Sequence, residues 1–532
     1  MSQNEQFRSD IPQSSPDNAP HHAHNEESKV TLTELGLPGT SQFNCRAEPK
    51  PAMNTARENA IASLIVLANI VPMISFGAGI GGGLSIGKSL GVQGPSEAGW
   101  IPASYSLTQG AFILMTGRLG TIYGHRKILL AGAGWWVLCS FVNAFCNNFI
   151  TFNLVRGLSG IGGAMIVPNA VAVIGTTFPP GRKRNLSLGL FGAGAPIGGW
   201  LGAFFAGLLA ELTPWKWLFI FMALLGCLVF GSLALVLPAE KLVTESERMD
   251  WFGSFLGIGG LILFNFVFNQ APMAGWGSPY EVALLVTAIA LFSSFGLWEY
   301  KFAHTPILPL TIWMAPSFFP LVLVVLISFM SYGTFIWYLV AWQQQIRHWS
   351  VLSTGLGLTP VAVCGGAAAV ISAWLIPRLA AQWIMALGCL AILIAQVLIA
   401  TMPEQQSYWA QVFPATILSA FCPDFIFTAA QIIACNSIKR HEQGIAGSLV
   451  GVLQVYATST GLGFAGIVET HTDDHGSLPV KGYRSALYFG MGMAVVALVI
   501  GVFFVRMPKD TREGWQDSAD SPESKSGEMV SV

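Results

Sequence analysis

Fourteen apolar runs, each about 20 residues long, divide the 532 residues of this chain. A run of that length, wound as an α-helix, is long enough to cross the roughly 30 Å hydrocarbon core of a bilayer. With 53% hydrophobic and only 10% charged residues, the chain cannot form an ordinary soluble surface. We therefore predict an all-α membrane protein with transmembrane helices at 60–83, 100–117, 128–146, 149–176, 186–210, 215–237, 252–271, 281–300, 317–342, 352–376, 383–401, 408–435, 443–468 and 485–505.

The placement of lysine and arginine predicts the side of the membrane on which each loop lies. With the N-terminus in the cytoplasm, cytoplasmic loops contain twelve basic residues and outer loops contain five. This asymmetry is expected because basic residues are retained on the cytoplasmic side. An even number of spans returns the C-terminus to that side, so we predict that both termini are cytoplasmic.

Composition also predicts the domain organisation. Residues 1–57 are rich in Ser, Pro, Asn, Gln and His and lack the apolar stretch of a signal peptide, which predicts a disordered cytoplasmic tail. We predict a six-helix bundle at 58–239, a charged cytoplasmic loop at 240–251 and a two-helix insert at 252–302. A second six-helix bundle at 303–506 and an acidic cytoplasmic tail at 507–532 complete the predicted order.

A glycine-rich turn joins the second and third predicted spans. Its glycines allow two membrane helices to turn and pack closely, and its basic residues hold the turn on the cytoplasmic side. The segment resembles the loop between the second and third helices of major facilitator superfamily transporters. The matching residues are Gly117, Leu119, Gly124, Arg126 and Lys127.

Other segments narrow the resemblance. Residues 100–111 resemble the start of the second helix in drug:proton antiporters with fourteen helices, and residues 154–164 resemble the fourth-helix arginine motif. The segment 189–199 is similar to the fifth-helix antiporter motif through Gly194, Pro196, Gly198 and Gly199. The chain looks most like the aminotriazole-resistance subgroup of the fungal fourteen-helix antiporters. That resemblance implies two six-helix bundles plus two extra helices, working by alternating access.

Three positions depart from the family pattern. Pro196 stands one residue late, which moves its kink by roughly a hundred degrees around the helix. Thr121 replaces an aspartate that helps to latch the two halves together in the family. Asn69 occupies the first span, where many cation exporters have an aspartate, and this argues against cationic dyes as the main substrates.

Arg156 is the one basic residue inside a predicted span. An arginine near the bilayer centre costs roughly 2.5 to 3.5 kcal/mol, so it needs a partner or a water-filled cavity. The resemblance implies proton coupling in a wet vestibule, which we favour. The alternative is a structural clamp to backbone carbonyls.

Asp424 is the acidic residue deepest inside a predicted span. Burial favours the neutral form of a carboxyl group, so Asp424 could take up and release a proton during transport. Alternatively, it stays protonated beside Pro423 and only completes a hydrogen bond. Glu211 and Glu469 fall at predicted outer helix ends, where we expect solvated anchors.

Polar and aromatic residues suggest a substrate cavity. Asp424 and Gln431 are seven residues apart and therefore share a helix face. For Trp337 and Tyr338, a belt at the membrane interface is the commoner explanation. The candidates for the cavity wall are Gln109, Trp337, Tyr338, Trp342, Gln431 and Gln454.

Several other functions fit the sequence poorly. Residues 82–89 match the phosphate-loop pattern, but they follow a membrane helix and belong to a predicted outer loop. The histidines and aspartates at 471–475 are better explained as solvated loop residues than as a metal site. Dispersed basic residues leave no surface for nucleic acid. We predict no metal, no cofactor and no enzymatic activity.

Taken with the resemblance, these features predict a proton-coupled antiporter that exports small toxic compounds, drugs or a secondary metabolite. Its partners would be a small-molecule substrate, protons and membrane lipid, and we expect a monomer in the plasma membrane, with the vacuolar membrane as the alternative. A proton-coupled importer of a small nutrient and a membrane sensor without transport are the other functions that the sequence allows.

Overall fold

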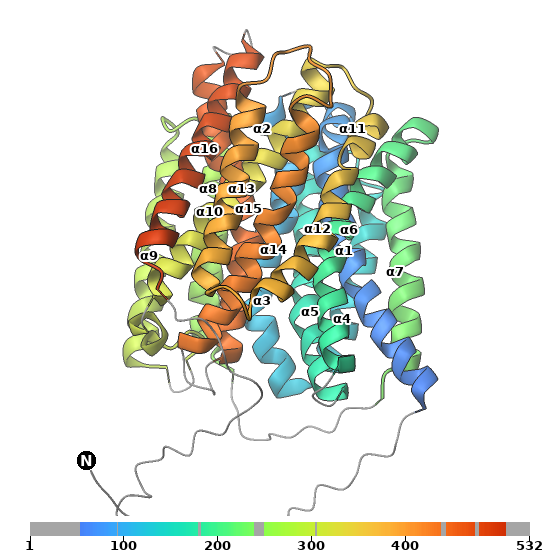
Figure 1. Cartoon of the computed structure of the whole chain (residues 1–532), viewed down its shortest axis with the longest axis vertical. Coiled ribbons are helices and arrows are strands. Elements are labelled where there is room, and N and C mark those ends of the chain that lie inside the picture. The colour runs from blue at the N-terminus through green and yellow to red at the C-terminus, as the bar shows by residue number, and fades with distance from the viewer. Residues whose placement is uncertain are drawn as a thin grey trace, which may run out of the picture. The chain divides into compact units, whose positions relative to one another are not determined.

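The computed structural model describes residues 54–92, 94–178, 182–238, 249–303, 306–315, 317–437, 443–473 and 478–506. These residues form long helices that run side by side, with no strand among them (Figure 1). Most of the two predicted tails and of the predicted loop at 240–251 lies outside the described residues. So do residues 474–477, which include part of the loop at 471–475.

Fourteen long helices coincide with the fourteen predicted runs, which confirms the predicted fold class. They are α1 (Thr55–Ser89), α3 (Trp100–Tyr123), α4 (His125–Asn143), α5 (Phe149–Thr177), α6 (Arg182–Leu212), α7 (Lys216–Val236), α8 (Trp251–Ala274), α9 (Pro279–Lys301), α10 (Phe318–Ala341), α12 (Thr359–Leu375), α13 (Ala381–Ala400), α14 (Val412–Ser437), α15 (Gln443–Thr472) and α16 (Pro479–Phe503). Four short elements accompany them: α2 (Pro95–Ala98), η1 (Leu310–Met314), η2 (Trp342–Ile346) and α11 (Val351–Gly357).

Judged by length, mean hydropathy and charge alone, twelve of the long helices can cross a membrane. Helices α3 and α4 are the two that do not meet these criteria. The sequence of α3 includes Ser104, Ser106 and Gln109, which are buried against other helices. Helix α4 begins with His125, Arg126 and Lys127. Both helices nevertheless pack along α5, which passes the criteria, so they belong to the same bundle.

Helix boundaries differ from the predicted ones mainly by extension. Helix α1 begins at Thr55, inside the segment predicted to be a tail, because Asn54 caps it by accepting a hydrogen bond from the Ala56 amide. Helix α3 continues through most of the predicted turn to Tyr123. Polar residues at a helix end do not stop the helix, so apolar length underestimates helix length.

The helices form two groups joined along two contacts. In the first group α1 packs on α6, and α5 packs on α3 and α4; in the second, α13 packs on α14 and α16, and α10 packs on α15 and α16. The groups meet where α3 contacts α15 and where α6 contacts α12. Helix α8 packs on α9 and also contacts both α3 and α15.

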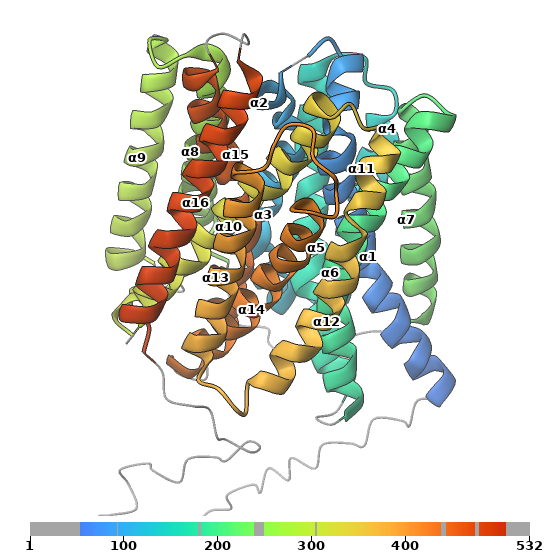
Figure 2. The same ribbon diagram turned by 45° about the horizontal axis from the view of Figure 1, so that its top comes forward.

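The two ends of the helix bundle are distinguished by the helix ends that lie there. The terminal end is where α1 begins and α16 finishes, and the distal end is where α1 finishes at Ser89 (Figure 2). The short elements α2, η2 and α11 follow or precede helices at the distal end.

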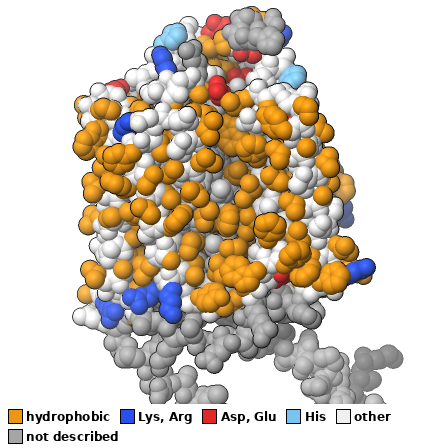
Figure 3. Space-filling view, turned by 180° about the vertical axis from the view of Figure 1, so that it is seen from behind, with side chains coloured by type: hydrophobic (Ala, Val, Ile, Leu, Met, Phe, Trp, Pro, Cys, Tyr) orange, Lys and Arg blue, Asp and Glu red, His pale blue; other side chains and the backbone are white. Residues whose placement is uncertain are grey.

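The sides of the bundle are apolar. Large hydrophobic side chains are exposed on several helices, among them Leu235, Val286, Val370 and Phe503. Figure 3 shows hydrophobic side chains over most of one face, with Lys and Arg gathered along the edge at the terminal end. Exposure of so much apolar surface is stable only in lipid, so the protein is an integral multi-pass membrane protein.

Candidate functional site

Arg156 lies about two turns from the distal end of α5 and is completely buried. Its Nε donates to the Ile101 carbonyl of α3 at 2.5 Å, and its Nη2 donates to the Ser75 carbonyl of α1 at 2.6 Å. The guanidinium carbon is 5.7 Å from the centroid of the Tyr105 ring. These are the contacts of the structural clamp, and the side chain is sealed off from solvent, contrary to the expected wet vestibule.

Glycine makes room for this clamp. A Cβ atom at Gly79 of α1 would overlap Nη2 of Arg156. The remaining guanidinium nitrogen, Nη1, is buried and has no hydrogen-bond partner among the described residues. The clamp therefore joins α1, α3 and α5 and still leaves one guanidinium nitrogen without a hydrogen bond among the described residues. Its role in proton coupling stays a prediction.

Gln109 lies on α3 inside the same helix group. It is 1% exposed, and neither of its amide atoms has a hydrogen-bond partner in the described part of the chain. A Cβ atom at Gly163 of α5 would lie 3.3 Å from its Nε2 and 2.5 Å from the Tyr105 hydroxyl. Gln109 therefore faces α5, and nothing in these contacts places it beside the other predicted cavity residues.

Helices α1 and α6 cross in direct backbone contact. A Cβ atom at Gly198 would lie 2.6 Å from Met73 Cβ, and one at Gly202 would overlap the Ile74 carbonyl oxygen. Gly194 also faces α1, whereas a Cβ atom at Gly199 would meet nothing within 4 Å. Small residues at every fourth position let two membrane helices approach this closely. Asn69 strengthens the crossing by donating to the Phe191 carbonyl at 2.7 Å.

Pro196 points away from this crossing and toward the other helix group. A Cβ atom at Gly365 of α12 would lie 2.6 Å from Pro196 Cβ and 3.7 Å from Asp424 Oδ2. Asp424 is half-buried, near the middle of α14. The structure thus brings a motif residue of α6 and the mid-span carboxyl group together where α6 meets α12.

The three aromatic residues predicted to line the cavity contact two neighbouring helices. The Trp337 indole edge lies against α1, where a Cβ atom at Gly83 would be 3.2 Å from it. Tyr338 donates its hydroxyl to Glu469 at 2.7 Å. The Trp342 ring lies 5.6 Å from the guanidinium carbon of Arg484. All three side chains are buried at the distal end. Trp337 faces α1, whereas Tyr338 and Trp342, four residues apart, both contact the Tyr483 ring of α16.

Two further cavity candidates lie between α14 and α15. Gln431 is half-buried and donates to the Gly447 carbonyl at 2.9 Å. Gln454 is half-buried on α15. Asp424 and Gln431 are both half-buried on α14, as expected for residues two turns apart, and the shared cavity wall stays a prediction.

Two overlapping stretches of the chain, 61–461 and 321–527, match the description Major Facilitator Superfamily. The chain belongs to this superfamily. The predicted family is therefore confirmed, and the paired helix groups are the fold expected of it.

Curated fungal relatives agree with the predicted subgroup of this major facilitator protein. The aminotriazole resistance protein of Saccharomyces cerevisiae is 32% identical over 79% of this chain and 79% of its own length. Efflux pump terJ of Aspergillus terreus is 34% identical over 84% of this chain and 86% of its own length. The low affinity ammonium transporter of Saccharomyces cerevisiae is also 34% identical, over 84% of this chain and 88% of its own length.

Solved structures support the fold of this major facilitator protein. The nucleoside transporter NupG superposes with a TM-score of 0.58 at 12% identity, covering 84% of this chain and 100% of its own. The POT family transporter PepTSo gives a TM-score of 0.58 at 13% identity, covering 84% of this chain and 97% of its own. At such low identity the likeness concerns the fold alone.

The glycine turn of the superfamily is tighter here than predicted. Gly124, with a φ of 101°, is the single residue between α3 and α4, a conformation that favours glycine. Arg126 donates to the Ala234 carbonyl of α7 at 3.2 Å, while Lys127 is exposed and Gly117 and Leu119 are half-buried. The turn therefore fastens α4 to α7 within one helix group.

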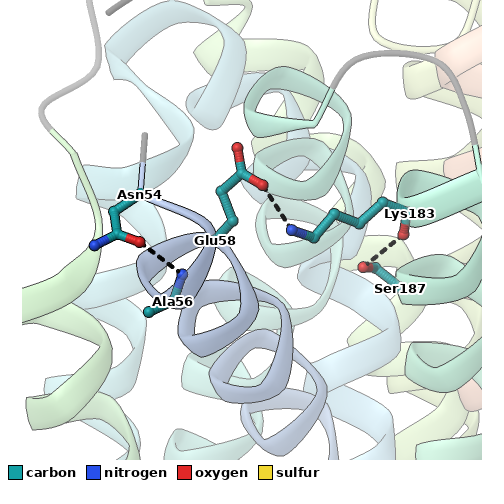
Figure 4. A network of polar contacts seen from close by, with 5 residues as sticks. All are labelled: Asn54, Ala56, Glu58, Lys183 and Ser187. Atoms are coloured by element: carbon teal, nitrogen blue, oxygen red, sulfur yellow. Dashed lines mark hydrogen bonds and ion pairs between the residues drawn. The ribbon is translucent and has the colours of Figure 1, made fainter. Parts of the chain in front are cut away.

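Thr121 occupies the position where the family has an aspartate. Thr121 donates to the Arg118 carbonyl of its own helix at 2.7 Å. A different ion pair lies at the same end, where Lys183 of α6 contacts Glu58 of α1 at 2.6 Å (Figure 4). Both partners are partly exposed, so the pair contributes at most about 1 kcal/mol.

Two residues with clear structural roles were missed by the sequence analysis. Gly202 extends the series Gly194 and Gly198 at intervals of four, a spacing that would have predicted its contact with α1. Glu469, expected to be a solvated anchor, is 2% exposed and bonded to Tyr338. No local sequence pattern predicts the burial of Glu469, because it depends on how α10 and α16 cover the end of α15.

Proposed function

We propose that this protein is a proton-coupled antiporter that exports small toxic compounds or a secondary metabolite by alternating access. The observation that carries the proposal is the position of Gly365 on α12, beside Pro196 of the other helix group and beside Asp424 of α14. A carboxyl group at that position changes its surroundings whenever α6 and α12 separate. Its affinity for a proton is therefore coupled to the motion that exposes a central site.

The positions of the basic side chains suggest how the protein is oriented in the membrane. The Lys and Arg side chains along the terminal end in Figure 3 fit a cytoplasmic position for that end. The distal end then faces the outside of the cell or the vacuolar lumen. We place the protein in the plasma membrane on its similarity to the efflux and resistance proteins.

The names of the relatives favour small, neutral or weakly polar substrates. Aminotriazole resistance is one such name, and efflux pump is another. The ammonium transporter, at similar identity, favours a second candidate function, transport of a small nitrogenous nutrient. Direction of flux separates the two candidates.

Inside-out vesicles test the proposal directly. In such vesicles the distal face lines the lumen, so an antiporter loads substrate when the lumen is acid. We expect labelled aminotriazole to accumulate in proportion to the pH gradient, and labelled methylammonium to serve as the probe for the nutrient alternative. Accumulation equal to that of vesicles without the protein, for both probes, would refute transport and leave a sensor role.

Replacement of Asp424 by asparagine should remove the dependence of this loading on the pH gradient. Asparagine keeps the size and polarity of the side chain but cannot bind or release a proton at physiological pH. Downhill exchange of the probe should persist, because the contact of Pro196 with Gly365 is untouched. Glu211→Gln, at an exposed helix end, is the matched control and should behave like the wild type. An unchanged gradient dependence in Asp424→Asn would assign Asp424 a structural role.

A further inference from the structure

Glu469 is a buried carboxyl group at the distal end. It lies three residues before the end of α15 and is 2% exposed. Its Oε2 accepts a hydrogen bond from the Tyr338 hydroxyl at 2.7 Å, and Tyr338 itself is 1% exposed. The group is therefore about one helical turn from the aqueous boundary and yet sealed from it.

The surroundings of Glu469 give it no positive partner among the described residues. From α16, the Tyr483 ring packs on Tyr338 at 5.8 Å, and a Cβ atom at Gly482 would lie 3.3 Å from Glu469 Cγ. Directly after α15, Asp473 adds a charge of the same sign. The polar helix terminus also disfavours an anion, since the last carbonyls of α15 point toward this end.

The basic residues nearby in the sequence are engaged elsewhere. Arg484 of α16 donates to the Met402 carbonyl at 2.9 Å and covers the ring of Trp342. Lys481 and His471 are exposed. On the neighbouring α2, Glu97 is also an acidic residue and so adds no positive charge either. An ionised Glu469 would be a buried charge without a counterion.

Tyr338 links Glu469 to the contact that closes the distal end. The preceding residue, Trp337, packs against Gly83 of α1. About two turns further along, Gln344 donates to the Gly81 carbonyl of α1 at 2.8 Å. These contacts of Trp337 and Gln344 with Gly81 and Gly83 are called the distal seam.

We propose that Glu469 is a proton-binding site that controls the distal seam. In the closed seam the carboxyl is neutral and hydrogen-bonded to Tyr338. Loss of its proton to the distal solution leaves a carboxylate that needs water, and hydration of the site displaces Tyr338 and with it Trp337. The assignment of Glu469 rests on the proposed function in one respect only, namely that the distal end is the outer face of the protein.

Infrared spectroscopy of the purified full-length protein tests proton binding without substrate or transport. A protonated carboxyl absorbs separately from a carboxylate, so a spectrum taken at about pH 5.5 minus one at about pH 8.5 should contain its band. The band should be lost in Glu469→Gln, which keeps an acceptor for Tyr338, and retained in Glu211→Gln. Asp424→Asn identifies the separate contribution of the mid-span carboxyl group. A full-strength band in Glu469→Gln that Asp424→Asn abolishes would overturn the proposal.

A second variant separates a proton site from mere packing. Tyr338→Phe removes the hydroxyl and keeps the ring, so the Glu469 band should persist and move to higher frequency as its hydrogen bond is lost. An unmoved band would contradict the geometry. If Glu469→Gln fails to fold, the shift of the carboxyl band in Tyr338→Phe still tests whether Glu469 binds the proton.

Hydrogen exchange then reports on the seam. At about pH 8.5, amides in residues 81–90 and 337–346 should exchange about tenfold faster in the wild type than in Glu469→Gln, and at about pH 5.5 the two should coincide. Equal exchange at both values would show that Glu469 does not control the seam. Because none of these readouts needs flux, a negative vesicle assay would refute the proposed function and leave the proton site standing.

Discussion

Replacement of Arg156 by alanine is expected to abolish proton-coupled flux and to lower the thermal stability of the protein. The guanidinium bonds the Ser75 carbonyl of α1 and the Ile101 carbonyl of α3 from its position on α5. Alanine leaves both carbonyls without that partner and opens a cavity between three helices. Each buried unpaired polar group costs about 1 to 3 kcal/mol, so a loss of about 3 kcal/mol or more is expected with the cavity included. Flux in inside-out vesicles and apparent Tm in detergent measure the two effects.

A lysine variant distinguishes the clamp from proton coupling. Arg156→Lys keeps the charge but cannot bond two carbonyls in the forked geometry of arginine. If the clamp is the main role, the lysine variant should lose most of the stability that alanine loses. If stability is kept and only gradient-driven loading is lost, coupling is the main role. Normal coupled loading and normal Tm in Arg156→Ala would remove the residue from both roles.

Replacement of Gly202 by alanine should prevent the assembly of α1 with α6. The added methyl group would overlap the Ile74 carbonyl oxygen and lie 2.6 Å from the Ala78 amide nitrogen. Both are backbone atoms, so no rotamer change relieves the overlap and the helices must separate. Overpacking of this kind costs about 3 kcal/mol or more. We expect little monodisperse protein by fluorescence-detected size-exclusion chromatography.

Gly199 supplies a matched control on the same helix. A Cβ atom there meets nothing within 4 Å, so Gly199→Ala should be produced at wild-type levels and should transport normally. Gly199 belongs to the predicted antiporter motif and Gly202 does not. If Gly199→Ala fails while Gly202→Ala is well folded, the packing of α1 on α6 described here is incorrect.

Patterns local in sequence predicted the helices well. Apolar length and the glycine-rich turn depend on a few neighbouring residues, and the structure places helices and turn accordingly. The boundary of α3 was predicted too early because residues 118–123 are less apolar but still helical. Hydropathy reports where lipid ends and not where backbone hydrogen bonding stops.

Contacts between helices were predicted less well. Arg156 was expected beside water and is instead bonded to two carbonyls, while Glu469 was expected in solvent and is buried against Tyr338. Trp337, Tyr338 and Trp342 were grouped as one wall, but Trp337 packs against α1 whereas Tyr338 and Trp342 both contact Tyr483 of α16. Each error concerns which residue a side chain contacts. That contact depends on how far the neighbouring helix is rotated about its own axis.

The amino-acid sequence alone therefore determined the membrane class, the fourteen helices, the superfamily and the position of the turn at Gly124. These follow from the need to bury apolar length and satisfy backbone hydrogen bonds within each helix. Only the tertiary structure decided that Pro196 and Asp424 both lie beside Gly365 of α12, that Arg156 bonds carbonyls of α1 and α3, and that Glu469 is buried against Tyr338. In lipid, apolar surface does not by itself select a partner helix. The contacts between helices therefore depend on small residues and polar groups that are far apart in the chain.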